Sequence, residues 1–376
     1  MTVKAATHSK IPWIETPLIK SATLSAAAGC LARPVTIPLM PFLSNVFLKL
    51  ENLQPSGSFK SRGIGNYLVS QLAAVQAADT RSTRKPHFYC SSGGNAGLAC
   101  VHGATTLGCE ATIVVPLSTT PYMVAKLREA GATEVIQRGA SWQEADKYLT
   151  ETLMPDATAR GEAAIYVPPF DAQQVWDGNA GITKEIVRQL PATERHYPIN
   201  AAAGDRDANP ATRVPKIDAI VCSVGGGGLF AGIVQGIDEL GLKQTTAIAV
   251  ETEGADSLAQ AIAKGELVTL PAITSRATSL GARRVCQRAF EYGMRDAVVS
   301  VVLPDSEAIG ACKRFLDEER LLVELACGVC PALCYNGQLG KLVPGFNKSS
   351  VVVLVVCGGS NMTLEMMDQY AGEQAK

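Results

Sequence analysis

The sequence predicts an α/β protein with two doubly wound domains and mostly parallel sheets. Short apolar runs rich in β-branched residues alternate with helical stretches of about 10–15 residues, as in strands joined by crossover helices. The run Val351–Val356 is entirely apolar, which is typical of a strand buried on both faces. The chain has 376 residues, enough for two such domains.

The expected elements follow one another as strand, helix, strand. Apolar runs bounded by turn residues predict strands at Val46–Leu50, His87–Ser91, Thr112–Val115, Glu134–Gln137, Ile165–Val167, Ile217–Ser223, Thr246–Glu251 and Val351–Cys357. Helical stretches between them predict helices at Ser61–Ala77, Gly94–Leu107, Thr120–Ala130, Ser141–Glu151, Trp176–Gln189, Leu229–Leu240 and Asp305–Arg320. Residues 191–215 interrupt the pattern because they have no apolar period, so we expect a surface insertion there.

The composition argues against several classes of function. The net charge is −1, from 34 basic and 35 acidic residues, so nothing draws the chain to nucleic acid or an acidic membrane. No apolar stretch reaches the roughly 18 residues that a membrane helix needs. The N-terminal residues also lack the apolar core of a signal peptide. We therefore expect a cytoplasmic protein that binds neither nucleic acid nor membranes.

The eleven cysteines are scattered and do not form a metal-binding pattern. Cys327, Cys330 and Cys334 are closely spaced, but no histidine or second cysteine pair accompanies them. We expect most of the thiols to be reduced and buried as small hydrophobic side chains in a reducing compartment.

A lysine lies in an unusual turn after the first expected strand. Residues Pro55–Ile64 read Pro-Ser-Gly-Ser-Phe-Lys-Ser-Arg-Gly-Ile, so Lys60 lies inside a Ser/Gly turn at the mouth of that strand. A lysine amine that is desolvated at such a position can form a Schiff base with a carbonyl compound. The alternative is an ordinary surface turn.

A second turn joins a strand to a helix at Cys90–Gly97, which reads Cys-Ser-Ser-Gly-Gly-Asn-Ala-Gly. Backbone N–H groups and hydroxyls at a helix N-terminus favour a carboxylate or a phosphate. The amide of Asn95 can donate to a phenolic oxygen. The alternative is a glycine-rich turn that a serine caps.

The third turn is Ser223–Leu229, which contains four successive glycines between a strand and a helix. Glycines lose much conformational entropy on ordering, but they let backbone N–H groups close around an anion. The run is not a P-loop, because no Gly-Lys-Ser/Thr follows, and it lacks the spacing of the dinucleotide fingerprint. A phosphate cup without nucleotide machinery indicates a phosphorylated cofactor.

The fourth segment, Val356–Asn361, follows the longest apolar strand and contains Cys357. Ligands of α/β sheets bind at the carboxyl ends of the strands. Cys357 is therefore either a core thiol or a neutral partner for a ring nitrogen.

A reactive lysine, an anion-binding turn, a phosphate cup and a thiol that faces a ring together specify pyridoxal 5′-phosphate (PLP). The chain resembles the fold-type-II PLP enzymes (tryptophan synthase β-like) and, within them, the catabolic L-serine/L-threonine dehydratases, or serine ammonia-lyases. The similarity runs from about Pro17 to Met362, apart from residues 191–215. It rests on Ser-Gly-Ser-Phe-Lys-x-Arg-Gly, Ser-Ser-Gly-Gly-Asn-Ala-Gly and Ser-Val-Gly-Gly-Gly-Gly-Leu, which occur in this order.

The resemblance implies a role for each matching residue. Lys60 would carry the Schiff base to the cofactor and act as the base at Cα, and Phe59 would lie against the pyridine ring. Asn95 would bond the 3′-oxygen, and Cys357 would face the ring nitrogen. The phosphate would be held by Gly225, Gly226, Gly227, Gly228 and Leu229. The substrate carboxylate would be received by Ser91, Ser92, Gly93, Asn95 and Ala96.

The resemblance also implies features beyond the cofactor site. A monovalent cation such as K⁺ would bind near Gly225, Glu251, Ala255, Leu280 and Ala282. The protein would be a homodimer. A large PLP-binding domain would comprise residues 1–60 and 166–376, with the insertion at 191–215, and a small domain would comprise residues 61–165.

The implied reaction is β-elimination of L-serine to pyruvate and ammonia, of L-threonine to 2-oxobutyrate and ammonia, or of both. A related enzyme of this fold for another β-hydroxy amino acid, or a serine racemase, is an alternative. Racemases of this fold carry a serine where this chain has Gly93, which cannot transfer a proton. Cysteine and cystathionine synthases fit the lysine motif and Cys357 less well. A PLP-less binding protein is the remote alternative, because every expected site residue is present.

Overall fold

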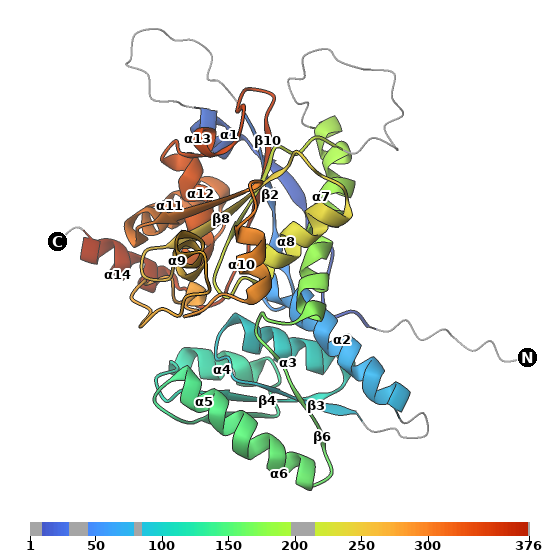
Figure 1. The fold of residues 1–376 in the computed structure, drawn as a ribbon. Coiled ribbons are helices and arrows are strands. Elements are labelled where there is room, and N and C mark those ends of the chain that lie inside the picture. The colour runs from blue at the N-terminus through green and yellow to red at the C-terminus, as the bar shows by residue number, and fades with distance from the viewer. Residues whose placement is uncertain (1–9, 30–43, 79–84, 197–214, 375–376) are drawn as a thin grey trace, which may run out of the picture. The chain divides into compact units, whose positions relative to one another are not determined.

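The computed structural model describes residues 10–29, 44–78, 85–196 and 215–374. It divides into two compact units whose segments alternate along the chain (Figure 1). Unit 1 comprises Met1–Ile14, Gln54–Ser56 and Lys60–Gly178, and unit 2 comprises Glu15–Leu53, Gly57–Phe59 and Asn179–Lys376. The chain therefore passes from unit 2 to unit 1 between Phe59 and Lys60.

Unit 1 is built on a four-stranded parallel sheet in the order β5-β4-β3-β6. Its strands are β3 (Pro86–Cys90), β4 (Glu110–Val115), β5 (Glu134–Gln137) and β6 (Ala163–Tyr166). Its helices are α2 (Lys60–Ala78), α3 (Asn95–Leu107), α4 (Pro121–Glu129), α5 (Trp142–Tyr148), a π-helical turn at Leu149–Leu153, and α6 (Met154–Ala159). Fully buried Leu68, Phe88, Val101 and Ile113 lie in a core between the sheet and α2 and α3.

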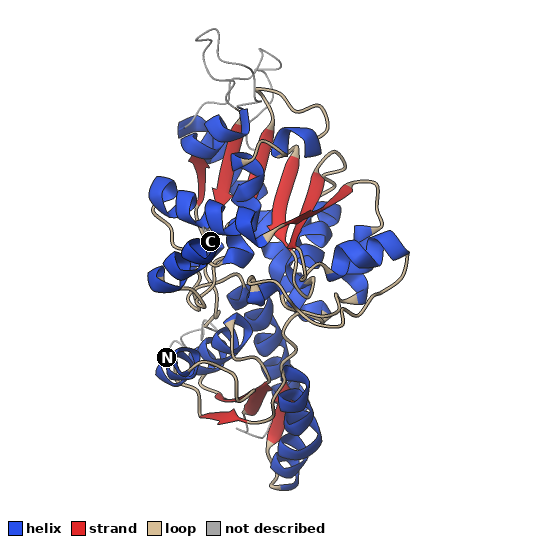
Figure 2. Cartoon of the chain, turned by 90° about the vertical axis from the view of Figure 1, so that its left-hand side faces the viewer, coloured by secondary structure: helices blue, strands red, loops and turns tan. Residues whose placement is uncertain are grey.

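Unit 2 is built on a six-stranded sheet in the order β1-β2-β10-β7-β8-β9. Its strands are β1 (Leu18–Ser21), β2 (Asn45–Lys49), β7 (Ala219–Ser223), β8 (Thr246–Thr252), β9 (Val298–Leu303) and β10 (Val351–Val355). Only the edge strand β1 pairs antiparallel among these strands. Both faces are covered by helices (Figure 2), so every residue of the central strands β7 and β10 is buried.

The helices of unit 2 are α1 (Ala22–Gly29), α8 (Gly228–Glu239), α9 (Ser257–Lys264), α10 (Gln287–Gly293), α11 (Asp305–Glu319), α12 (Leu325–Tyr335), α13 (Leu339–Leu342) and α14 (Leu364–Gln374). Helix α7 (Gln173–His196) begins in unit 1 and continues into unit 2. Among the described residues, no helix is both long and apolar enough to span a bilayer.

Local signals explain where several helices begin. The hydroxyl of Thr120 accepts a hydrogen bond from Met123 N, and Pro121 occupies the first turn of α4. Ser141 caps α5 in the same way through Glu144 N. Helix α3 ends at Gly108, whose φ of 65° is the left-handed conformation that glycine adopts readily.

The predicted α/β class with mostly parallel sheets is confirmed, and each predicted strand and helix overlaps an observed one. The main omissions are β1, β9 and helices α1, α6, α9, α10, α12, α13 and α14. Helix α12 was hidden by Gly328 and Pro331, which disfavour helix locally. It forms because residues 325–334 are all buried, so tertiary packing overrides propensity.

The segment expected as a surface insertion is described only at its two ends. Residues 191–196 continue helix α7 through Pro191, and residues 197–214 lie outside the described residues. Residue 215 leads into strand β7.

Candidate active site

Lys60 is the first residue of helix α2, where a Ser/Gly turn ends. The turn is closed within unit 1 by Ser61, whose hydroxyl oxygen lies 2.7 Å from Ser56 Oγ and 3.2 Å from Ser56 N. The Lys60 amine donates a 2.5 Å hydrogen bond to the carbonyl oxygen of Pro169. The amine is thus held by a backbone acceptor in a partly buried position.

The preceding half of this turn is fixed in unit 2 beside Cys357. The backbone N–H of Phe59 donates to the carbonyl of Cys357 at 3.0 Å, and Ser58 forms a β-bridge with Gly358. Gly57 has a φ of 79°. The segment that carries Phe59 is therefore paired with the segment that carries Cys357.

The turn at Ser91–Asn95 lies between strand β3 and helix α3 in unit 1. Gly94 is the N-cap of α3, and no side chain caps the helix. A Cβ at Gly97 would collide with the carbonyl oxygen of Ser92, so the turn folds tightly over the first turn of the helix. The Gly94 N–H donates to Ser92 Oγ at 3.3 Å. The N-terminal end of a helix favours a bound anion.

Within unit 1, Ser91 forms a hydrogen bond with Asp146, a residue that the sequence analysis did not identify. Its hydroxyl donates to Asp146 Oδ1 at 2.6 Å, and the hydroxyl of Tyr166 donates to the same oxygen at 2.8 Å. Burial and the hydrogen bond to Asp146 raise the pKa of Tyr166. Asp146 thus holds the start of the Ser91–Asn95 turn, and the Ser91 hydroxyl is committed to it.

Gly93 lies against the end of strand β4 and the loop that follows it. A Cβ at Gly93 would be 2.9 Å from Thr119 Cγ2 and 3.1 Å from Val115 Cγ1. Both distances are too short for a side chain without movement of these neighbours. A side chain at position 93 would therefore need Thr119 and Val115 to shift.

The four-glycine turn joins strand β7 to helix α8 in unit 2. Gly227 is the N-cap residue of α8 and has a φ of 88°. It makes no side-chain hydrogen bond that caps the helix. A Cβ at Gly227 would collide with Ala289 and lie 2.6 Å from Val285 Cγ2. At Gly225, a Cβ would lie 3.0 Å from Leu280 Cα. The glycines thus form a cradle that excludes side chains and leaves helix N–H groups available to an anion.

Cys357 follows strand β10 and is 5% exposed. Its sulfur lies 3.6 Å from the hydroxyl of Ser223, the residue that precedes the glycine turn. A hydrogen bond with Cys327 and then burial raise the pKa of Cys357 well above its ordinary value. The side chain is consequently a neutral thiol at physiological pH.

The comparisons with known proteins agree with these features. A family model described as pyridoxal-phosphate dependent enzyme matches residues 13–358. The chain belongs to this family. An L-serine dehydratase of Saccharomyces cerevisiae is 38% identical over 322 residues, which is 85% of this chain and 89% of that protein. A human serine dehydratase-like protein is 41% identical over 366 residues, or 96% and 95% of the two chains.

A solved structure extends the likeness to the fold. The fungal L-serine ammonia-lyase from Rhizomucor miehei is 31% identical, with a TM-score of 0.77, and the match covers 96% of this chain and 99% of that one. The family, the fold type and the PLP cofactor expected from the motifs are thereby confirmed.

The residues of this PLP enzyme fit the cofactor in unit 2. The cradle at Gly225–Gly228 has the uncapped helix end that a phosphate requires. The neutral thiol of Cys357 lies near it, because its sulfur is 3.6 Å from the hydroxyl of Ser223, the residue two positions before Gly225. In unit 1, Lys60 and Asn95 each begin a helix, α2 and α3.

The expected cation residues of the PLP enzyme are partly committed to other bonds. Glu251 is fully buried in β8, and its two oxygens accept hydrogen bonds from Leu258 N at 2.9 Å and Ala259 N at 2.8 Å. Burial raises the pKa of Glu251 to about 8. Gly225 and Leu280 are in contact, whereas Ala255 N and Ala282 N bond within their own turns. The cation site stays a prediction.

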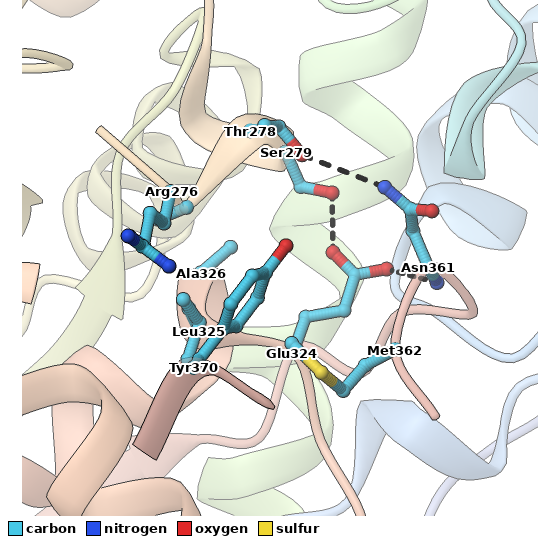
Figure 3. A pocket seen from close by; sticks show the side chains of 10 residues that line it. Arg276, Thr278, Ser279, Glu324, Leu325, Ala326, Asn361, Met362 and Tyr370 are labelled. Carbon is cyan, nitrogen blue, oxygen red and sulfur yellow. Dashed lines mark hydrogen bonds between the residues drawn. The ribbon is translucent and has the colours of Figure 1, made fainter. Parts of the chain in front are cut away.

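Figure 3 shows a small polar pocket in unit 2. One of its lining residues, Ser279, has its carbonyl oxygen 3.2 Å from the Cβ position of Gly225. It is lined by Arg276, Ala277, Thr278, Ser279, Glu324, Leu325, Ala326, Asn361, Met362 and Tyr370. Glu324 lies at its centre and accepts hydrogen bonds from Ser279 and Asn361. No local motif indicated this carboxylate, because its partners Ser279 and Asn361 are 45 and 37 residues away along the chain.

Proposed function

We propose that this PLP enzyme is an ammonia-lyase for L-serine and L-threonine. It would convert L-serine to pyruvate and ammonia, and L-threonine to 2-oxobutyrate and ammonia. The observation that carries the proposal is the 38–41% identity to proteins named L-serine dehydratase or serine dehydratase-like over 85–96% of this chain. The fungal L-serine ammonia-lyase, which matches along nearly its whole length, supports the same reaction.

The chain supplies groups suited to each part of this reaction. The N-terminal end of α3, which begins at Asn95, would receive the substrate carboxylate, with the amide of Asn95 toward the cofactor's 3′-oxygen. The amine of Lys60 would remove the proton from Cα, since no other basic side chain belongs to the proposed site. PLP, when bound, supplies the electron sink that makes this proton acidic.

The groups proposed for the cofactor favour elimination. The glycine cradle would hold the phosphate through backbone N–H groups and place it at the start of α8. The neutral Cys357 thiol would not supply a proton to the ring nitrogen, because its pKa is raised by Cys327 and by burial. A neutral thiol opposite the ring nitrogen would limit how long negative charge persists at Cα. It would thereby favour prompt loss of the β-hydroxyl.

The site offers little support for racemisation. A racemase needs a second acid on the opposite side of Cα, and Gly93 has no side chain to provide one. Thr119 and Val115 occupy the space that a side chain at Gly93 would need. The proposed protein is therefore a lyase that leaves the configuration of unreacted serine unchanged.

The decisive experiment measures keto acid and ammonia from L-serine, L-threonine, their D-forms and bulkier β-hydroxy amino acids. We expect product from one or both L-forms, and at least a thousand-fold lower rate in Lys60→Ala because it lacks the base. Lys147→Ala is the matched control, since the side chain of this lysine of unit 1 is 71% exposed and pairs with the exposed Glu151 in the π-helical turn that follows α5. PLP-loaded protein that produces no keto acid from any of these substrates would contradict the proposal.

Three further features belong to the same proposal. We place the enzyme in the cytoplasm as a homodimer, with K⁺ near Gly225. Sedimentation should give twice the mass of one chain. Activity in potassium buffer should exceed that in a buffer whose only cation is a bulky organic ammonium ion.

A further inference from the structure

Glu324 is a buried carboxylate that the proposed reaction does not use. It is 3% exposed and is the N-cap residue of helix α12. Its backbone carbonyl accepts the N–H groups of Cys327 and Gly328, as an N-cap carbonyl does. Its side chain, however, does not cap the helix. The carboxylate is directed instead toward two other segments of unit 2.

These two segments are Thr278–Leu280 and the turn that ends at Asn361. Glu324 Oε2 accepts a hydrogen bond from the Ser279 hydroxyl, and Oε1 accepts one from Asn361 N at 2.7 Å (Figure 3). Gly359 has a φ of 124°, and a Cβ there would collide with the carboxylate of Glu324. The turn is thus folded directly onto this side chain. Hydrogen bonds to an ionised acceptor are stronger than neutral ones.

Each of these segments leads to one end of the proposed cofactor site. Next to Ser279, Leu280 Cα would lie 3.0 Å from a Cβ at Gly225, the first glycine of the cradle. On the other side, Asn361 closes the turn that begins at Cys357. A single carboxylate therefore connects the phosphate-binding glycines to the proposed partner of the ring nitrogen.

We propose that Glu324 is a positioning residue that sets the separation between the glycine cradle and Cys357, and so matches unit 2 to the length of PLP. The proposal rests on the cofactor-binding roles given above to these residues. A buried charge is costly unless it is well hydrogen-bonded, and both carboxylate oxygens have such a partner. The negative charge of Glu324 also adds to the effects of Cys327 and burial that raise the pKa of Cys357.

The test measures cofactor binding without substrate in Glu324→Gln, Ser279→Ala and the double variant. Apo-protein is titrated with PLP, and the dissociation constant, absorbance maximum and ³¹P NMR shift of the bound phosphate are recorded. We expect each single variant to bind PLP about ten-fold to 150-fold more weakly, the loss that follows from removing a hydrogen bond to a charged group. The double variant should lose little more, because both changes break the same link.

The matched control is Asp218→Asn. Asp218 also accepts a backbone N–H, from Val351 at 2.8 Å, but it lies at the opposite end of β10 from Cys357. Its variant should lower the midpoint of thermal unfolding and leave PLP affinity and the ³¹P shift unchanged. Glu324→Gln with wild-type affinity and ³¹P shift, or with losses equal to those of the control, would overturn the proposal.

The experiment separates this inference from the proposed reaction. No amino acid is present in the titration, so the result does not depend on which substrate the enzyme uses. If Glu324→Gln fails to fold, Ser279→Ala decides alone, because it removes one hydroxyl and leaves the buried charge and its bond to Asn361 in place.

Discussion

Glu251 illustrates how one buried side chain couples the fold to pH. Its carboxyl group is fully buried in β8, and burial raises its pKa from the ordinary 4.5 to about 8. Two N–H groups at the start of α9 oppose this shift but do not cancel it. The folded protein thus keeps a proton on Glu251 at a pH where the unfolded chain has released it.

The free energy of unfolding should therefore fall as pH rises from about 4.5 to about 8, because in this range the native state binds more protons than the unfolded state. Urea unfolding measured in potassium-free buffer across this range checks the slope. Glu251→Gln should flatten the slope, since the amide does not titrate. Equal slopes in the two proteins would contradict the prediction.

A bound cation would change this behaviour in a defined direction. Positive charge near Gly225 would lower the pKa of Glu251 and favour its ionised form. Potassium should then stabilise the wild-type protein more at pH 8 than at pH 5. This comparison tests the expected cation site independently of activity.

At the residue scale, the sequence identified groups whose chemistry is visible in a local motif. Lys60, the four glycines and Cys357 each follow a strand, and the structure places them at strand or helix ends as expected. Ser279 and Asn361 are 45 and 37 residues from Glu324, so no local pattern joins them. Asp146 was missed for the same reason, since it lies 55 residues from Ser91.

The turn before helix α8 shows what one element requires of its residue types. Gly227 combines a φ of 88° with close neighbours at Ala289 and Val285. A residue with a side chain at this position would have a strained backbone, and its Cβ would overlap with Ala289 and Val285. The proposed phosphate-binding end of the helix therefore needs glycine at position 227 both for its backbone conformation and for its packing.

Gly227→Ala should lose about 1–2 kcal/mol of stability from backbone strain and about 1–3 kcal/mol more from overpacking, and it should bind PLP more weakly. Gly241→Ala is the matched control. Gly241 has a φ of 66° but has no atom within 4 Å of a Cβ position, so only the strain applies. Urea unfolding and PLP titration distinguish the two. Equal losses in both variants would show that crowding at Gly227 is unimportant.

At the element scale, strongly patterned segments were predictable and short or unusual ones were not. Strand β1 has four residues, two of them polar, and pairs only along one edge of its sheet. Helix α12 contains a proline and a glycine and owes its form to burial on all sides. In both cases the neighbours in space, rather than the local sequence, decide the structure.

Across the whole chain, a buried ionic network joins distant parts of unit 2. The Lys49 amine is fully buried and donates to Glu185 Oε2 at 2.5 Å, Thr16 O at 2.6 Å and Gln189 Oε1 at 3.0 Å. These partners come from the segment before β1 and from helix α7. The network thus ties the N-terminal part of unit 2 and α7 to the sheet.

Lys49→Met should lower the free energy of unfolding by about 3–5 kcal/mol, because it leaves the Glu185 carboxylate without its buried partner. Lys184→Met is the control, because Lys184 lies in α7 one residue before Glu185. Lys184 and Glu239 form an exposed pair whose removal costs about 1 kcal/mol or less. Urea unfolding measures both. Similar losses in the two variants would mean that the buried network contributes no more than a surface pair.

At the scale of the molecule, alternation of strands and helices was sufficient to predict an α/β protein with parallel sheets. It did not show that Gln54–Ser56 belongs to one unit and Gly57–Phe59 to the other. Such exchanges within a few residues depend on contacts with segments about 300 residues away, such as that of Phe59 with Cys357.

The position of β10 has a consequence for synthesis on the ribosome. β10 is the last strand along the described chain, yet it lies between β2 and β7 in the middle of its sheet. Unit 1 has all its strands once residue 166 has emerged, whereas the sheet of unit 2 lacks its centre until residue 355 follows. Until then β2 and β7 present unpaired edges that invite aggregation. Because Cys357 follows this strand, the proposed cofactor site of a nascent chain is incomplete until residue 357 has emerged.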